Sequence, residues 1–164
     1  MSYRFMPASE SDAPQVFALI RDRIQWMRET GLRQWDAVDY WGFFPESYFF
    51  QAIADQRLYV VEETGGGRVV CAGVLSFQDP DWTDGVPAVY LHNFAGARDA
   101  PGAGGFFLER GEEYARAHGR TRFRLDCMES NKKLNQYYAR RGFRAVGRVE
   151  KPGYVGVQRE KPLT

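Results

Sequence analysis

The sequence predicts one α+β domain, spanning residues 1–164, in which a mixed sheet of about seven strands is flanked by about four helices. Three observations predict this fold. The chain is long enough for one ordinary domain with a hydrophobic core and too short for two. Runs rich in β-forming residues alternate with runs of helical periodicity. A Gly-rich turn joins one strand to a helix and then a further strand, which predicts a parallel neighbouring pair.

Each expected element follows from a local pattern. Ser and Asp precede the first helical run and Gly31 follows it, which predicts where that helix starts and ends. Two β-rich runs surround residues 65–67, a glycine triplet typical of a hairpin. Gly96, inside a later strand, is expected to mark a bulge or a close approach of the backbone. In chain order we expect a strand at 3–9, a helix at 9–31, an aromatic segment turning helical at 32–56, a hairpin at 57–77, a strand at 88–97, a helix ending at 119, a strand at 122–128, a helix at 130–142, and strands at 143–150 and 154–160.

Composition excludes several classes of protein. Lys and Arg number 22 against 21 Asp and Glu, so no nucleic acid partner is expected. The apolar runs fall far short of the ~18 residues of a membrane span, and the first residues lack a signal-peptide pattern. We therefore expect a cytoplasmic protein with no membrane partner. Cys71 and Cys127 stand alone in apolar surroundings, which predicts buried free thiols and no metal site.

A Gly-rich loop before the second long helical run raises the first functional question. Its residues are Asp99, Ala100, Pro101, Gly102, Ala103, Gly104 and Gly105. The first N–H groups of a helix lack intrahelical acceptors and suit an anion such as a pyrophosphate. A dinucleotide loop would need glycine at Phe107, and a Walker loop would need Lys after the last glycine, so both are disfavoured. A tight turn without a ligand fits the same glycines, and this stretch alone leaves both readings open.

A second pattern follows in residues 130–143. Ser130 can cap a helix there, and Gly142 can end it. The apolar positions of this helix are Leu134, Tyr137 and Tyr138. Asn131 and Tyr138 are seven residues apart, two turns along one face, so both side chains can face one cleft.

Together the two patterns resemble the GCN5-related N-acetyltransferase (GNAT) superfamily, which moves an acyl group from acyl-CoA to an amine. The loop from Asp99 to Gly104 looks like the family's phosphate loop, and Asn131, Tyr138 and Gly142 with the following Phe match the spacing of its later motif. The predicted strand order also follows that fold over nearly the whole chain. The resemblance implies acetyl-CoA as the acyl-donor cosubstrate, bound where a parallel pair of strands splays apart.

Two residues depart from the family's phosphate loop. Asp99 stands where the family prefers Gln or Arg, and a carboxylate there would repel a pyrophosphate. Pro101 removes one N–H donor from the loop. We expect either that Asp99 turns outward while Arg98 supplies the missing cation, or that the coenzyme binds weakly.

The chemistry of acyl transfer assigns roles to a few side chains. Tyr138 is the expected catalytic acid, because a phenol of pKa about 10 stays protonated and can donate to a departing thiolate. His92 is the first candidate for the base, with an Asp or Glu acting through water as its rival. Phe94 to Gly96 would offer backbone groups to the pantetheine arm. The expected coenzyme-binding residues are Phe94, Ala95, Gly96, Arg98, Asp99, Ala100, Pro101, Gly102, Ala103, Gly104, Gly105, Asn131 and Tyr138.

The acceptor is expected among aromatic and acidic side chains. The expected acceptor-binding residues are Trp35, Tyr40, Trp41 and Asp84. Aromatic rings near carboxylates favour an amine, although core packing and turn formation explain these residues too. We expect an N-acetyltransferase that acts on a primary amine of a small molecule or peptide by direct attack on the thioester, with a homodimer as one form it could take. A non-catalytic CoA-binding or sensing module of the same fold is the alternative.

Overall fold

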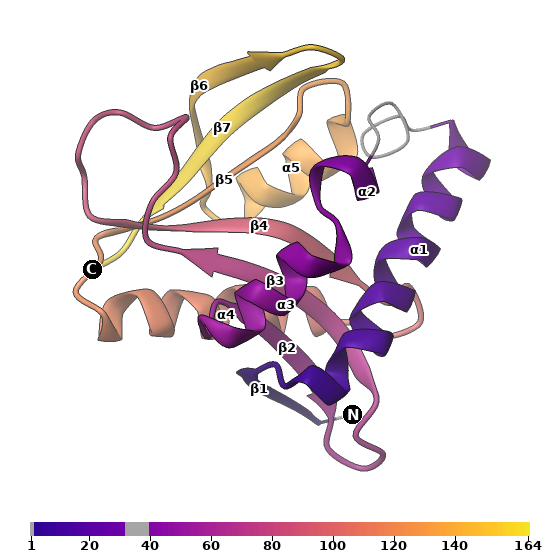
Figure 1. Cartoon of the computed structure of the whole chain (residues 1–164). Helices are drawn as coiled ribbons and strands as arrows, with labels where there is room; N and C mark the ends of the chain where they lie inside the picture. The colour runs from indigo at the N-terminus through magenta and orange to yellow at the C-terminus, as the bar shows by residue number, and fades with distance from the viewer. Residues whose placement is uncertain (1, 32–39) are drawn as a thin grey trace.

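The computed structural model describes residues 2–31 and 40–164, which form one mixed sheet with helices on both faces (Figure 1). In these residues the strands are β1 (Tyr3–Pro7), β2 (Leu58–Glu63), β3 (Val69–Ser76), β4 (Ala88–Gly96), β5 (Arg122–Met128), β6 (Arg144–Lys151) and β7 (Tyr154–Pro162). The α-helices are α1 (Ala13–Thr30), α2 (Tyr40–Phe43), α3 (Glu46–Ala54), α4 (Ala103–Ala117) and α5 (Lys132–Arg140), with a 3-10 turn at Glu10–Asp12. The expected order is confirmed; the described part adds one short helix, because the 32–56 segment contains both α2 and α3.

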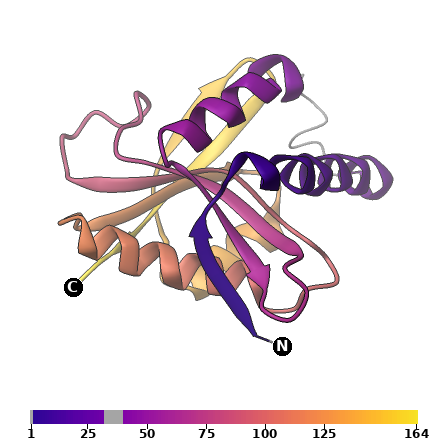
Figure 2. The same ribbon diagram turned by 60° about the horizontal axis from the view of Figure 1, so that its bottom comes forward.

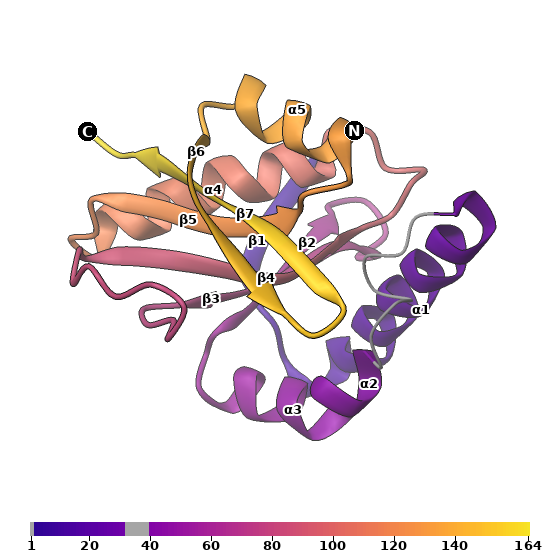
Figure 3. The ribbon, with the colours of Figure 1, turned by 90° about the horizontal axis from the view of Figure 1, so that it is seen from above.

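The seven strands lie in the order β1-β2-β3-β4-β5-β7-β6. All neighbours are antiparallel except β4 and β5, which confirms the predicted mixed sheet with one parallel pair. Figure 2 shows the sheet between α4 and the N-terminal helices, and Figure 3 shows α4 and α5 on the face opposite α1, α2 and α3. The sheet is therefore the middle of three layers.

Alternation along the strands gives each face its own core. In β2, Tyr59 and Val61 belong to the apolar cluster under α4, whereas Leu58 and Val60 belong to the cluster under α1 and α3. Successive side chains of a strand point to opposite faces, so both layers of helices bury apolar surface on one sheet. Gly111 lets α4 approach closely, because a Cβ there would lie 2.6 Å from the Phe123 ring.

The parallel pair opens partway along its length. β4 and β5 are paired from Ala88 with Arg122 to Tyr90 with Arg124. Beyond Tyr90, no described strand pairs with β4 on its β5 side, although β4 runs on to Gly96 and stays paired with β3 as far as Cys71. The two strands thus separate toward their carboxyl ends, which gives the splayed pair that the family resemblance implies.

A bulge marks the place where β4 bends away, and its position differs from the expected one. The pairing with β3 shifts between Ala72 and Val74, and Asn93 on the opposite strand has a φ of 56°. Of the two alternatives expected for Gly96, a bulge or a close approach of the backbone, the bulge is wrong, since Gly96 keeps its pairing with Cys71. Asn tolerates left-handed backbone better than most residues, which explains why the bulge forms at Asn93.

Candidate active site

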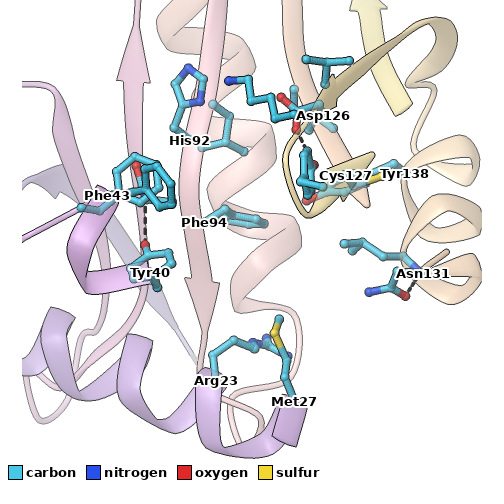
Figure 4. Close-up of a pocket in the computed structure, with 18 of the residues that line it drawn as sticks. Arg23, Met27, Tyr40, Phe43, His92, Phe94, Asp126, Cys127, Asn131 and Tyr138 are labelled. Atoms are coloured by element: carbon cyan, nitrogen blue, oxygen red, sulfur yellow. Dashed lines mark hydrogen bonds between the residues drawn. The ribbon is translucent and has the colours of Figure 1, made fainter. Parts of the chain in front are cut away.

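A cavity of about 1420 Å³ lies where β4 and β5 separate. Figure 4 shows His92 and Phe94 on β4, Asp126 and Cys127 on β5, Arg23 and Met27 on α1, and Asn131 and Tyr138 at the far side, and all of them line the cavity. We call the lining from α4 and α5 the α4–α5 wall: Gly104, Asn131, Leu134, Tyr137 and Tyr138. Side chains from both faces of the sheet therefore meet in one space.

The glycines before α4 and in its first turn differ in why a glycine is present. Gly102 precedes the helix with a φ of 80°, a conformation that favours glycine. A Cβ at Gly105 would press on the Arg141 guanidinium at 3.1 Å. A Cβ at Gly104 would meet only ordinary contacts, 3.7 Å from the Phe94 ring and 4.0 Å from the Tyr137 hydroxyl. The protein's own packing thus tolerates a side chain at Gly104, where the backbone borders the cavity.

The start of α4 keeps unbonded donors near the cavity. Phe106 is the first residue of α4 whose N–H bonds to the carbonyl four residues earlier, on Gly102. The N–H groups before it at Gly104 and Gly105 lack such an acceptor, and the helix dipole adds positive potential there. Pro101 lies one turn earlier and its carbonyl accepts a hydrogen bond from the Tyr3 hydroxyl at 2.8 Å. This helix start can bind an anion with backbone donors alone.

The one carboxylate of the glycine loop, on Asp99, is paired with an arginine from another part of the chain. Asp99 accepts hydrogen bonds from Arg68, at the end of the β2–β3 hairpin, at 3.2 and 3.3 Å. Arg98 lies over the Trp26 ring at 5.7 Å, and Arg23 lies over the same ring at 5.2 Å. Arg23 donates to the carbonyl of Gly96, and it has no carboxylate partner among the described residues. Two guanidinium groups therefore stand beside the end of β4.

Helix α5 places Asn131 and Tyr138 on the cavity. Asn131, rather than the expected Ser130, is the N-cap, and its side-chain oxygen accepts from the Leu134 N–H at 3.2 Å. Tyr138 is 5% exposed and packs against Phe143 with ring centroids 5.6 Å apart. Burial, and then the nearby Cys127, raise the pKa of Tyr138. The phenol is therefore protonated at neutral pH and is able to donate.

On the other face of the sheet, four polar residues form what we call the His92 corner: Asp79, His92, Asp126 and Tyr154. His92 and Asp126 lie two residues beyond the last paired residues of β4 and β5, so they stand across the opening on the same face of the sheet. His92 Nε2 is 3.2 Å from Asp79 Oδ2. Tyr154 donates to Asp126 at 2.5 Å. Burial raises the pKa of Asp126, and the hydrogen bond from Tyr154 opposes that rise only in part.

The expected acceptor residues are divided by the structure. Tyr40 lines the cavity, where it accepts from Asn93 at 2.9 Å, and burial raises its pKa. Trp41 does not line the cavity and packs edge-on against Phe17. Asp84 also lies outside the lining, where both of its carboxylate oxygens accept from Arg124, at 2.9 and 2.6 Å. Trp35 lies outside the described residues.

Of the remaining expected residues, three line the cavity and the others do not. Phe94, Gly96 and Gly104 line it directly. The residues Ala95, Arg98, Asp99, Ala100, Pro101, Gly102, Ala103 and Gly105 do not. Cys71 and Cys127 are free and buried, as predicted, and burial raises the pKa of both thiols.

The polar residues that line the cavity and that sequence reasoning missed include Arg23, Asp126 and Tyr154. Asp126 stands on β5 between the buried Leu125 and Cys127, and a carboxylate between two buried apolar neighbours is the local signal that could have indicated it. In the described part of the chain, no group of three or more His, Cys, Asp or Glu side chains could hold a metal ion. No described helix is long and apolar enough to cross a membrane.

A mixed sheet in which the one parallel pair among the described strands opens over a glycine loop and a buried tyrosine defines a class of acyltransferase. The family model described as Acetyltransferase (GNAT) family matches residues 20–143. The chain therefore belongs to the GNAT family of acetyltransferases and is an N-acetyltransferase, which confirms the resemblance.

Individual relatives agree with this assignment. The uncharacterized N-acetyltransferase YesJ of Bacillus subtilis (strain 168) is 26% identical over 165 residues, covering 94% of this chain and 88% of the relative. A GNAT-family acetyltransferase from Listeria monocytogenes 4b F2365 has a TM-score of 0.78 at 26% identity, covering 98% of this chain and 95% of that one. The PaiA N-acetyltransferase of Thermoplasma acidophilum, solved with coenzyme A, has a TM-score of 0.78 at 13% identity over 99% of both chains and shares the fold.

Acetyl-CoA is the acyl donor of this family, and the residues present fit it. Gly104 borders the cavity without a packing reason of its own, and the adjoining helix start offers free donors for a pyrophosphate. The unpaired edge of β4 beyond Tyr90 can take an extended arm as a further strand would. The cavity then continues past both features to His92 and Tyr138.

Proposed function

We propose that this acetyltransferase moves the acetyl group of acetyl-CoA to a primary amine of a small molecule or peptide by direct attack of the amine on the thioester. The observation that carries the proposal is that Tyr138 and His92 line one cavity from opposite faces of the sheet. Tyr138 belongs to the cluster under α4. His92 follows Leu91, which faces that same cluster, so the alternation of β4 turns His92 toward α1–α3.

The two side chains suit the two proton transfers of the reaction. The amine forms a C–N bond to the acetyl carbon while the C–S bond breaks. His92 takes a proton from the amine, and Tyr138 gives its proton to the departing sulfur. The raised pKa of Tyr138 supports this role, because the hydroxyl keeps its proton until negative charge develops on the sulfur beside it.

The acceptor side of the cavity favours a cationic amine. Its rings include Tyr40, Phe43, Phe44 and Tyr48, and its acids include Asp79 and Asp126. Aromatic faces and carboxylates both attract ammonium groups. Phe43 supports a role in binding, because it is 68% exposed, an unusual position for a large apolar side chain.

The test is an assay for free CoA and for acetylated product with acetyl-CoA and a panel of alkylamines, amino acid amides and peptides. We expect release of CoA that depends on the amine, with equal amounts of N-acetylated product. The alternative, a non-catalytic CoA-binding module, predicts binding of acetyl-CoA with no release above the rate without protein. A His92→Gln variant separates enzymatic turnover from contamination, because its turnover should fall.

A further inference from the structure

The loop between β3 and β4, residues 77–87, brings a buried carboxylate to His92. The side chain of Asp79 is 4% exposed, and its Oδ2 lies 3.2 Å from His92 Nε2. Its Oδ1 accepts the backbone N–H of Asp81 at 2.8 Å, and its carbonyl accepts the N–H of Trp82 at 3.1 Å. The carboxylate is thus held from two directions in one orientation, as in an Asx turn.

The ionisation of Asp79 decides which nitrogen of His92 carries hydrogen. Burial opposes the charged form, but the hydrogen bonds from His92 and from the Asp81 N–H outweigh it, and the pKa of Asp79 is lowered. An ionised carboxylate only accepts hydrogen bonds. His92 Nε2 must therefore donate to it, and in a neutral imidazole the lone pair then belongs to Nδ1.

The other ring nitrogen belongs to a side chain that borders the cavity. The His92 side chain is 32% exposed and lines the cavity. No described residue forms a hydrogen bond with its Nδ1. The charged and titratable groups that line the cavity together with His92 include Asp79 and Asp81 in the loop, Asp126 on β5, Lys151 on β6, Tyr154 on β7, and Tyr40 and Tyr48 from α2 and α3.

We propose that Asp79 is a positioning residue that holds His92 in the Nε2–H tautomer and thereby makes Nδ1 the atom that takes the proton from the acceptor amine. This inference rests on the proposed function of His92 as base. When the proton moves from the amine to Nδ1, the ring carries hydrogen on both nitrogens and one positive charge. Asp79 then faces that charge at hydrogen-bonding distance, and the proton later leaves Nδ1 for solvent.

Tertiary contacts keep the loop, and with it Asp79, in this place. Lys151 pairs with the Asp81 carboxylate at 2.8 Å, and Gln158 donates to the Asp81 carbonyl at 3.1 Å. Arg124 stacks on the Trp82 ring at 4.4 Å while it holds Asp84. Side chains of β5, β6 and β7 therefore fix a loop that precedes β4, which is how a base on β4 acquires its carboxylate.

The experiment reads the tautomer directly and the rate separately. Nitrogen NMR of ¹⁵N-histidine-labelled wild-type protein without substrates should show His92 protonated at Nε2 and not at Nδ1. In Asp79→Asn, the side-chain oxygen can still accept from Asp81, but its NH₂ group now faces Nε2 and donates to it. The proton should therefore move to Nδ1. The value of kcat should fall by about 10²–10⁴-fold, as when a catalytic histidine is held in the wrong tautomer, while the Kd for acetyl-CoA stays unchanged.

Matched variants separate the possible failures. Glu150→Gln removes one negative charge from the exposed β6 beside Lys151 without touching His92, so tautomer and kcat should stay as in the wild type. A wild-type ring protonated at Nδ1 overturns the inference, whether or not Asp79→Asn folds. Asp79→Asn with the wild-type tautomer and kcat overturns it as well. If His92→Gln keeps full activity, the proposed base is wrong, and the tautomer spectrum still reports on Asp79 independently.

Discussion

The α4–α5 wall and the His92 corner line the same cavity from opposite faces of the sheet, yet they are built in different ways. The wall comes from two short stretches, the first turn of α4 and helix α5 with its N-cap, and four of its five members lie within residues 131–138. The corner takes one residue each from a loop, β4, β5 and β7. Asp79 and Tyr154 both belong to this corner although they are 75 residues apart in the chain.

This difference explains which half is easier to recognise from sequence. A wall built from local turns needs fixed residue spacings, because helix geometry alone decides which side chains share a face. A corner assembled by strand pairing needs only that the sheet bring the right residues together, and no spacing in the sequence records that. Variants that act on one side and spare the other are the sharpest tests of this division.

Outside the His92 corner, the largest expected effect is on the wall. Tyr138→Phe keeps the buried ring and deletes only the hydroxyl, so we expect about 10²-fold slower acetyl transfer in single-turnover experiments, with little change in the Kd for acetyl-CoA. Tyr137→Phe is the matched control, since its ring lies next to Tyr138 and lines the same cavity. A full rate in Tyr138→Phe would leave the residue as a structural part of the wall, and a loss in Tyr137→Phe alone would transfer the role.

The next effect concerns binding at the start of α4. Gly104→Val should weaken acetyl-CoA binding by about tenfold or more, about 1.4 kcal/mol, because side-chain atoms would block the approach to the backbone donors. Gly104→Ala sharpens the test, since the protein itself has room for that Cβ and alanine favours the helix. Calorimetry gives the Kd and thermal melting gives the stability. Unchanged affinity in a folded Gly104→Val protein would exclude this turn as the phosphate site.

A smaller effect is expected from the charges beside the same turn. Arg98→Ala should weaken acetyl-CoA binding several-fold, whereas Asp99→Arg should leave it equal or improved, because Asp99 is paired with Arg68. Arg68→Ala is the control, since it releases the Asp99 carboxylate and should weaken binding at low salt. The arrangement is contradicted if Asp99→Arg clearly loses affinity while Arg98→Ala does not.

The smallest effect is on stability and concerns the loop that carries Asp79. The hydrogen bond from Arg124 lowers the pKa of Asp84 to about 2. A carboxyl whose folded pKa lies below its unfolded value of about 3.9 stabilises the fold above pH 4 and loses that contribution between about pH 4 and 2. The pair is half exposed on the Asp84 side, so we expect at most about 1 kcal/mol.

Urea unfolding at several pH values measures this contribution. Asp84→Asn should unfold at lower urea than the wild type at pH 6, and the difference should shrink as the pH falls toward 2. A difference that stays constant over this range would show that the Asp84 charge does not tether the loop.

Several features could be predicted because they depend on neighbours in the chain. Gly31 ends α1 with a φ of 79°, and the glycine triplet lies in the turn of the β2–β3 hairpin, where Gly67 has a φ of 69°. Both φ values lie in the left-handed region that favours glycine. The bulge was misplaced because Gly96 and Asn93 can both adopt unusual backbone, and only the pairing with β3 selects Asn93. Asp84 was expected at the acceptor because its partner, Arg124, is 40 residues away in the chain.

The sequence by itself determined the order of the elements, the family, the glycine loop and the Asn131–Tyr138 spacing, because turns, caps and helix periodicity act over a few residues. Only the tertiary structure decided that β4 and β5 separate after Tyr90, that Arg68 pairs with Asp99, and that the Asp79 carboxylate lies beside His92. Those contacts follow from the register of strands far apart in the chain. Register is set by the whole buried pattern of the sheet, so no local stretch of this sequence specifies them.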